Sequence, residues 1–295
     1  MMDRKTLLSL LGKPPVNPEL SLELLEEIDC GAYIRRKVSY LVEPGERITA
    51  YLCLPTVDSG PFPAVFCFHE HGGNRLLGKS EVVGLAGSPD QAYAKELAQR
   101  GYVTLAPDAI CFEERADPED PTYFHLQQLH TRLVKGETLL GKVLFDMSVG
   151  LDLLASLPEV DSSRMGFIGH SYGGRTALFA PVYDRRIKTA VCNCGSTNFK
   201  NMLKHDTGIQ FDFVVPGFLD HGDLEDVVRL VEPASLLIQG TVDDKGSLGI
   251  EEMVEYARPA FRQGTLAYRV FPGQHEFSQP MRQYAYEFLD EQLKS

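Results

Sequence analysis

The sequence lacks any apolar stretch long enough to cross a bilayer, which takes about 20 residues. Its first residues, MMDRKTLLSLLGKPP, hold a leucine run that is too short for the apolar part of a signal peptide, and no small-residue cleavage site follows. Internal repeats and low-complexity tracts are also missing. We therefore expect a cytoplasmic, globular protein without a membrane partner.

The sequence also has fewer basic residues than acidic residues. It contains 29 Lys and Arg against 41 Asp and Glu, so its formal net charge is −12. Nucleic acids and anionic membranes attract proteins through a basic face. The charge balance therefore argues against nucleic acid as a partner, and we expect a small-molecule substrate instead. The oligomeric state is left open, and a homo-oligomer is compatible with the sequence.

None of the cysteines forms a C-x-x-C pair, so the commonest zinc and dithiol motifs are absent. Several lie in apolar, strand-like runs, which predicts buried free thiols. Cys192 and Cys194 share one face of a predicted strand, but no histidine or further cysteine accompanies them at ligand spacing. We predict no metal and no cofactor. The six cysteines are Cys30, Cys53, Cys67, Cys111, Cys192 and Cys194.

What the sequence does contain is an alternation of strand-like and helix-like segments from about residue 62 onward. This alternation predicts a parallel, doubly wound α/β sheet with helices on both faces. Buried strands are expected at 64–68, 102–106, 165–168, 188–194, 235–239 and 266–271. Two β-rich segments, 32–42 and 47–54, come earlier and predict an antiparallel pair at the sheet edge, joined by a turn at Pro44-Gly45-Glu46.

We expect one α/β domain over residues 32–295, preceded by a helical extension over residues 1–31. Leucines at helical spacing in 3–12 and 18–28 indicate two short helices in that extension. Two further segments interrupt the strand–helix alternation and are candidates for cap elements over a binding site, because long connections in compact domains are often functional. They span residues 110–136 and 197–231.

The most informative motif is G-x-S-x-G at residues 169–173, between an apolar run and a helical pattern. A serine at such a strand–turn–helix junction is held on a strained elbow with its hydroxyl above the sheet. Glycines flank it because side chains there would collide with the turn. We predict that Ser171 is a nucleophile and that the Tyr172 amide stabilises an oxyanion. The alternative is a glycine-rich turn with an idle serine.

A serine nucleophile needs a base, and the base needs an acid that orients it. In one common arrangement the nucleophile comes first in the chain, the acid second and the histidine last. For this order, His275 is the only one of eight histidines that follows a plausible acid at a strand end. Two aspartates follow the predicted strand 235–239. The pattern G-x-x-D favours Asp243 as the acid, and Asp244 is the alternative. Both could also be acidic residues at a helix start.

The loop after the strand 64–68 reads HEHGG and is expected to supply a second oxyanion donor through its backbone. We favour the amide of His71, with that of Glu70 as the alternative. A metal site made by this His-Glu-His run is a competing hypothesis. Against it, the spacing is not H-E-x-x-H on a helix, and no third ligand is evident.

Taken together, HEHGG, RGYVTLAPDA, PEVDSSRMGFIGHSYGG, IQGTVDD and GQHEF resemble the α/β-hydrolase superfamily, and within it the dienelactone-hydrolase-like and acetyl-xylan-esterase-like serine hydrolases. The resemblance covers roughly residues 35 to 290. It implies the α/β-hydrolase fold, with a sheet of about eight strands and a Ser-Asp-His triad. By position, the triad is Ser171, Asp243 and His275, and the oxyanion amides are those of His71 and Tyr172.

These observations predict a serine hydrolase that cleaves carboxylic esters, with short acyl or acetyl groups, through an acyl-enzyme intermediate. A small-peptide or amide hydrolase would use the same residues, so the sequence does not separate the two. A non-catalytic binding protein on the same scaffold is a third hypothesis. It would predict the loss of a triad residue, and all three residues are present.

Overall fold

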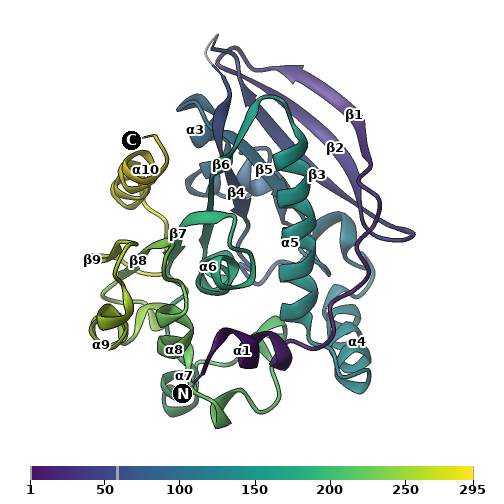
Figure 1. The fold of residues 1–295 in the computed structure, drawn as a ribbon. Coiled ribbons are helices and arrows are strands. Elements are labelled where there is room, and N and C mark those ends of the chain that lie inside the picture. Colours follow the sequence, from purple (N-terminus) through teal and green to yellow (C-terminus); the bar gives the residue numbers. More distant parts are fainter. Residues whose placement is uncertain (1, 58–59, 295) are drawn as a thin grey trace.

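The computed structural model describes residues 2–57 and 60–294. A nine-stranded sheet forms its centre, in the order β1-β2-β3-β5-β4-β6-β7-β8-β9 (Figure 1). The strands are β1 (Leu22–Asp29), β2 (Tyr33–Glu43), β3 (Glu46–Pro55), β4 (Phe62–Phe68), β5 (Val103–Pro107), β6 (Val160–His170), β7 (Ile187–Asn193), β8 (Ser235–Thr241) and β9 (Leu266–Phe271). The predicted α/β-hydrolase fold is confirmed, with nine strands where about eight were expected.

Strands β4 to β9 pair in parallel, and helices cover both faces of the sheet. In β4, Phe66 packs into the core on one face, while Val65 and Cys67 pack into the core on the other. This is why β4 is continuously apolar: successive side chains point to opposite faces, and both are buried. The first core contains α5 (Leu139–Ser156), α6 (Tyr172–Tyr183), α8 (Leu224–Arg229) and α9 (Ile250–Ala257); the second contains α2 (Lys79–Val82), α3 (Tyr93–Gln99) and α10 (Gln279–Leu293).

The other end of the sheet is antiparallel. Strands β2 and β3 form the predicted hairpin, and β3 continues antiparallel onto β5. The turn between β2 and β3 contains Gly45 at φ +87°, a backbone conformation that favours glycine. The edge-pair prediction is therefore confirmed, except that β2 and β3 are not themselves the edge, because β1 pairs outside β2.

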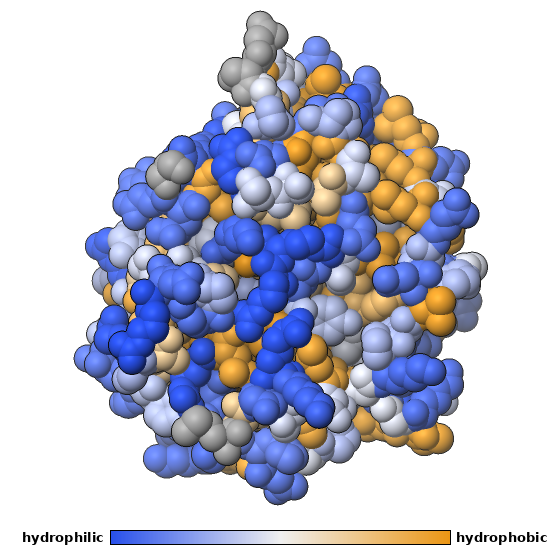
Figure 2. Space-filling model, viewed as in Figure 1, coloured by the Kyte–Doolittle hydropathy of each residue, from blue (hydrophilic) through white to orange (hydrophobic). Residues whose placement is uncertain are grey.

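The prediction of a second N-terminal helix over 18–28 is wrong. Only α1 (Arg4–Leu10) is helical in this region, with the Asp3 carboxylate capping it through the Thr6 amide, whereas residues 22–29 form strand β1. The edge of β2 offers hydrogen-bond partners to the backbone of residues 22–29. This pairing outweighs the helical spacing of the leucines, because a helix here would not bury them. The leucines of β1 are 43–55% exposed, and Figure 2 shows hydrophobic residues along the edge where β1 lies.

The two candidate cap segments are more ordered than their sequences suggested. The first contains η2 (Glu113–Arg115) and α4 (Pro121–Val134). The second contains α7 (Phe199–His205), η3 (Phe211–Phe213), η4 (Phe218–Asp220) and α8. They meet where the His125 ring of α4 stands edge-on to Phe211, with ring centroids 5.3 Å apart. Phe199, Phe213 and Phe218 are buried, so they anchor the second segment to the core.

Two predictions from composition can be compared with the structure. All six cysteines are free thiols, and five of them are buried while Cys30 is half-buried. Across residues 2–57 and 60–294, no helix combines the length and apolar character that a membrane span requires.

The short connecting element η1 (Pro89–Gln91) precedes α3, and η5 (Lys245–Ser247) and η6 (Arg258–Ala260) flank α9.

Candidate functional site

Ser171 lies between the last residue of β6 and the first residue of α6. Its φ of 54° and ψ of −109° are outside the ordinary helical and strand regions, a conformation that costs about 1–3 kcal/mol. The Ser171 amide donates a hydrogen bond of 2.8 Å to the Asn193 carbonyl of β7, which fixes the turn against the neighbouring strand. The strained elbow predicted from the motif is therefore present.

Two glycines make this elbow sterically feasible. A Cβ on Gly169 would lie 2.3 Å from the carbonyl carbon of Gly173. A Cβ on Gly173 would lie 2.1 Å from the carbonyl oxygen of Phe68 in β4. Both neighbours are backbone atoms that cannot turn away, so the motif glycines are required by close packing of the α6 start onto the strands.

Tyr172 starts α6 and points its ring into the core. The ring stacks on Phe112, with centroids 5.5 Å apart, and the phenol donates a hydrogen bond of 3.1 Å to the buried carboxylate of Asp212. The first amides of a helix have no intrahelical acceptor, so the Tyr172 N–H is available at the Ser171 side of the turn. An N–H in this position is a candidate oxyanion donor.

The structure contradicts Asp243 as the partner of the histidine. His275 Nδ1 lies 2.9 Å from Oδ1 of Asp244, whereas Asp243 is exposed. The reason is the length of β8, which pairs with β9 as far as Thr241 instead of ending at Gln239. The pairing continues when the Val242 amide bonds the Phe271 carbonyl, so the loop turns inward only at Asp244. The alternative aspartate is the one in contact.

Asp244 is itself held in place. Its carboxylate accepts hydrogen bonds from the Gly246 amide at 2.8 Å and from the Ser247 hydroxyl at 2.5 Å. Burial raises the pKa of Asp244, but its bonds to His275 and Ser247 outweigh burial and keep the pKa below its ordinary value. The carboxylate therefore stays ionised beside the imidazole and fixes its orientation.

His275 titrates above an ordinary histidine. Burial lowers its pKa, but the hydrogen bond and charge of Asp244, together with the charge of Glu70, raise it above 6.5. With Nδ1 committed to Asp244, the other ring nitrogen is free to accept a proton. His275 and Ser171 line the same pocket, but among the described residues the Ser171 hydroxyl has no hydrogen-bond partner. Such bonds often form only when substrate is bound.

The first residue of the loop that follows β4, His69, fixes this loop through hydrogen bonds of its ring. His69 is buried, and its Nε2 accepts a hydrogen bond of 3.1 Å from the Ala109 amide, while Nδ1 donates to the Glu70 carbonyl at 2.6 Å. Burial lowers the pKa of His69 to about 4, so the ring is neutral, as this pair of bonds requires. Both the Glu70 and His71 amides follow directly, and both remain candidates for the second oxyanion donor.

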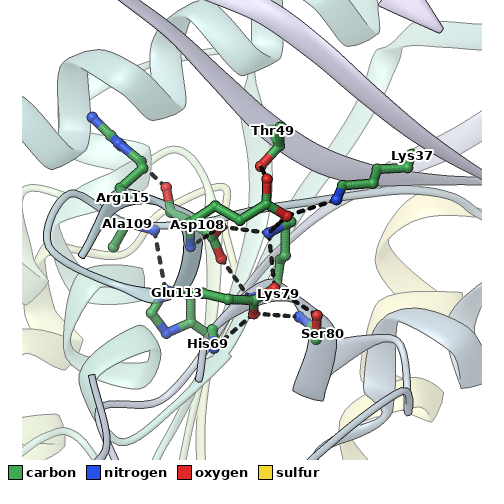
Figure 3. A network of polar contacts seen from close by, with 11 residues as sticks. Lys37, Thr49, His69, Lys79, Ser80, Asp108, Ala109, Glu113 and Arg115 are labelled. Atoms are coloured by element: carbon green, nitrogen blue, oxygen red, sulfur yellow. Dashed lines mark hydrogen bonds and ion pairs between the residues drawn. The ribbon is translucent and has the colours of Figure 1, made fainter. Parts of the chain in front are cut away.

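An ion cluster around the buried Lys79 ammonium also helps to hold the loop that follows β4 (Figure 3). The Lys79 ammonium is fully buried and lies 2.6 Å from Asp108, 2.8 Å from Glu113 and 2.9 Å from Glu114. Burial lowers the pKa of Lys79, but the three carboxylates outweigh it and raise the pKa, so the cation persists. Asp108 directly follows β5 and precedes Ala109, so the cluster links the ends of β4 and β5.

The sequence interpretation missed two groups around His275. His170 directly precedes Ser171 and is not among the site residues predicted from the sequence, yet its ring centroid lies 4.8 Å from that of His275. The sequence suggests Glu70 as an amide donor and as a member of the His-Glu-His metal hypothesis, but not as a carboxylate near the base. In the structure its carboxylate lies 3.8 Å from His170 Nε2 and its charge acts on His275. Glu70, His170 and His275 bring ligand-capable atoms within 4.8 Å of one another. Only the fold shows this, because the three residues lie at or just beyond the ends of three different strands, β6 for His170, β4 for Glu70 and β9 for His275.

This geometry bears on the metal alternative. His69 uses both ring nitrogens within the protein, so the run His69-Glu70-His71 does not form a ligand set. The metal-capable clusters among the described residues are Glu70, His170 and His275, and Cys194, Asp244 and His275. The Asn193 amide group lies 2.7 Å from Nδ1 of His170, and if it donates there, Nε2 carries the proton and faces Glu70. That arrangement favours a hydrogen bond over metal binding.

Similar solved structures share the architecture. A glucuronoyl esterase from Solibacter usitatus superposes with a TM-score of 0.73 at 16% identity, covering 98% of this chain and 91% of the other. Acetyl xylan esterase 1 from Thermoanaerobacterium sp. JW/SL YS485 gives a TM-score of 0.68 at 16% identity, covering 100% and 99%. At this identity the likeness establishes the fold.

Sequence relatives identify the family. The protein named "Putative hydrolase YtaP" from Bacillus subtilis (strain 168) is 29% identical over 245 residues, which cover 82% of this chain and 80% of the relative. A protein named "Putative carboxymethylenebutenolidase" from Yersinia pestis is 25% identical over 175 residues, covering 58% and 59%. The family profile "Dienelactone hydrolase family" matches residues 48–211, more than half of the chain. The chain therefore belongs to the dienelactone hydrolase family, within the α/β-hydrolase fold.

Proposed function

We propose that this protein is a serine hydrolase of carboxylic esters, with Ser171 as nucleophile, His275 as base and Asp244 as acid. The observation that carries the proposal is the combination of a strained Ser171 with a His275–Asp244 pair at the same pocket. An idle serine would need neither the strained backbone nor an oriented imidazole beside it.

In the proposed mechanism Ser171 attacks the ester carbonyl while His275 takes the hydroxyl proton. Asp244 keeps the proton of the resting imidazole on Nδ1 and stabilises the imidazolium that forms. The amide of Tyr172, with that of His71 or Glu70, faces the developing oxyanion and contributes about 3 kcal/mol for each donor. His275 then returns the proton to the leaving alcohol, and water releases the acyl group by the reverse sequence.

Family membership and fold support an ester substrate. The relatives include hydrolases, and the structural neighbours include a glucuronoyl esterase and acetyl xylan esterases. We propose short acyl or acetyl groups, because the pocket beside Ser171 is lined mainly by small or polar residues. Among residues 2–57 and 60–294, no contact favours an amide over an ester.

The proposal is tested with p-nitrophenyl esters of increasing acyl length, compared with acetylated sugars and with the matching anilides. We expect the acetyl and short acyl esters to give the highest kcat/KM and the anilides to be cleaved far more slowly. A Ser171→Ala variant that keeps the rate of the intact protein would contradict the proposed nucleophile.

A further inference from the structure

A second histidine–aspartate pair lies buried outside the site described above. His125 belongs to α4 and Asp212 to η3, so the pair joins the two cap segments. Both side chains are fully buried, and His125 Nε2 lies 3.2 Å from Asp212 Oδ2. The contact is too bent for a well-aligned hydrogen bond, and within residues 2–57 and 60–294 neither atom bonds elsewhere. Because a buried polar atom without a partner is costly, each of these two atoms depends on the other.

The other ring nitrogen of His125 determines which group faces Asp212. Its Nδ1 lies 2.9 Å from Nε of Arg75, a residue of the loop after β4. Arginine only donates, so Nδ1 accepts this bond and the ring proton is on Nε2. The order is therefore guanidinium, imidazole and carboxylate, with each donor facing an acceptor. The guanidinium also donates to the Thr122 hydroxyl at 3.2 Å and lies over the Phe211 ring.

The second oxygen of Asp212 binds the residue that follows the nucleophile. The Tyr172 phenol donates a hydrogen bond of 3.1 Å to Oδ1. Burial raises the pKa of Tyr172 well above its usual value, and the charge of Asp212 raises it further, so the phenol keeps its proton and remains a donor. The amide of the same residue is the candidate oxyanion donor at the start of α6. A displacement of the Asp212 carboxylate therefore acts on that donor through the Tyr172 ring.

The pair also reaches the second candidate donor, in this case through Arg75. Arg75 lies in one compact turn with His71: the Asn74 amide donates to the His71 carbonyl at 3.1 Å, and the Gly73 amide donates to His71 Nδ1 at 3.1 Å. The charges act on this turn as well. Burial lowers the pKa of His71 and the charge of Arg75 lowers it further, whereas the charge of Asp212 raises it. The turn that holds His71 is thus tied to the pair at its Arg75 end.

The separation of the two candidate donors matters for the chemistry. Tyr172 follows β6, whereas Glu70 and His71 follow β4, so the two N–H groups come from different elements. An oxyanion is stabilised only when its donors lie about 2.7–3.1 Å from the charged oxygen. A misplacement of about 1 Å costs about 100-fold in rate. Groups that fix the two elements relative to each other therefore affect the rate without contacting the substrate.

We propose that His125 and Asp212 are positioning residues that hold the two oxyanion donors at a fixed separation, one through the Tyr172 phenol and the other through Arg75. This inference rests on the proposed esterase function and goes beyond it, because it assigns residues that act only through their neighbours. It also gives the two cap segments a part in catalysis, since each contributes one side chain of the pair.

The first test compares two replacements of the imidazole, measured as kcat and KM on the best p-nitrophenyl ester. His125→Gln offers an amide oxygen to Arg75 and an amide N–H to Asp212, whereas His125→Leu offers neither. We expect His125→Leu to lower kcat by about 10–100-fold with KM within about twofold, and His125→Gln to recover most of that loss. A role in packing alone would favour leucine, which needs no partner. Equal kcat in the two variants would overturn the inference.

Two further variants keep the test decisive if His125→Leu does not fold. Tyr172→Phe removes only the hydroxyl, and Asp212→Asn turns an N–H toward the Nε2 proton of His125. Each should lower kcat by about tenfold or more, counted per active site by titration with a fluorophosphonate. The matched controls His130→Gln and Asp220→Asn change exposed residues of α4 and η4 and should leave kcat within about twofold. Unchanged kcat in both Tyr172→Phe and Asp212→Asn would overturn the inference.

A boronic acid tests whether the loss arises at the oxyanion. The Ser171 oxygen adds to the boron of phenylboronic acid while its proton passes to His275, and the resulting tetrahedral adduct places an oxygen at the oxyanion position. Such adducts resemble the transition state, so the inhibition constant should rise in each variant by the factor by which kcat/KM falls. A lower kcat with unchanged inhibition by phenylboronic acid would place the effect elsewhere and overturn the inference.

The outcomes separate this inference from the proposed function. If the intact protein cleaves the esters and requires Ser171, but the His125, Asp212 and Tyr172 variants keep its kcat, the esterase proposal stands and the positioning role is wrong. If the intact protein cleaves no p-nitrophenyl ester, the esterase proposal is wrong and the positioning role falls with it.

Discussion

At the scale of single residues, the central feature is the choice between two adjacent aspartates. Asp244 is buried and bonded to His275, while Asp243 faces solvent. The G-x-x-D pattern favoured the wrong one, because the decision depends on where β8 stops pairing with β9. The residue at which this pairing ends is set by hydrogen bonds between the backbones of β8 and β9. The residue types of the following loop do not reveal it.

This difference gives a paired prediction. Asp244→Asn should lower kcat by about 10³–10⁴-fold, because the imidazole loses the acceptor that fixes its tautomer. Asp243→Asn should change kcat by about twofold at most, as expected for an exposed residue. Both variants are measured on the best p-nitrophenyl ester. Comparable losses in the two variants, or a larger loss in Asp243→Asn, would contradict the assignment.

The raised pKa of His275 predicts a specific pH dependence. The base must be neutral to accept the Ser171 proton, so kcat/KM should fall as pH drops through the pKa of His275. Since Asp244 and Glu70 raise that pKa, the midpoint of the acidic limb should lie above 6.5. Glu70→Gln should move the midpoint to lower pH. A limb below 6.5 in the intact protein, or one unmoved by Glu70→Gln, would show that these charges do not act on the base.

At the scale of secondary-structure elements, the elbow was predictable and the N-terminal segment was not. The motif predicts the β6–α6 junction because only glycines at 169 and 173 allow the backbones to approach. The leucines of 18–28 fit a helical spacing, yet the segment forms β1, since its partner β2 lies adjacent in the fold. Local spacing determines structure where the side chains that it aligns become buried, and all residues of β1 are exposed.

The tight packing of the elbow predicts a large stability cost for one methyl group. Gly173→Ala should lower the free energy of unfolding by about 3 kcal/mol, since its Cβ would lie 2.1 Å from the Phe68 oxygen. Gly101→Ala is the control: it has φ +88° but open space around it, so about 1 kcal/mol of backbone strain is expected. Urea unfolding of both variants measures the difference. Equal costs would mean that the elbow relaxes freely.

The ion cluster beside the loops that follow β4 and β5 predicts that two lysine variants differ in their cost to stability. Lys79→Met should destabilise the fold by about 3–5 kcal/mol, because it leaves Asp108 buried without its cation. Lys37→Met removes a neighbouring, more exposed lysine that contacts Glu114, and it should cost about 1 kcal/mol or less. Chemical denaturation distinguishes them. A similar small cost for both would indicate that water or rearranged side chains replace the Lys79 ammonium.

At the scale of the whole molecule, the sheet explains why distant residues meet. Ser171, Asp244 and His275 follow β6, β8 and β9, which are parallel and therefore present their carboxyl ends at one edge. The sequence was sufficient to predict that edge and the residues Ser171 and His275 on it. It did not predict the pairing of Asp244 or the neighbouring carboxylate of Glu70, because each depends on contacts between separate elements.

The most direct test of the esterase proposal is covalent labelling of the intact protein with a fluorophosphonate, followed by peptide mass spectrometry. An activated serine should be phosphonylated at Ser171, and the rate of labelling should fall sharply in Asp244→Asn. Labelling at Ser171 with this dependence is the predicted result. Folded protein that remains unlabelled at Ser171, or that is labelled equally fast without Asp244, would contradict the proposed mechanism.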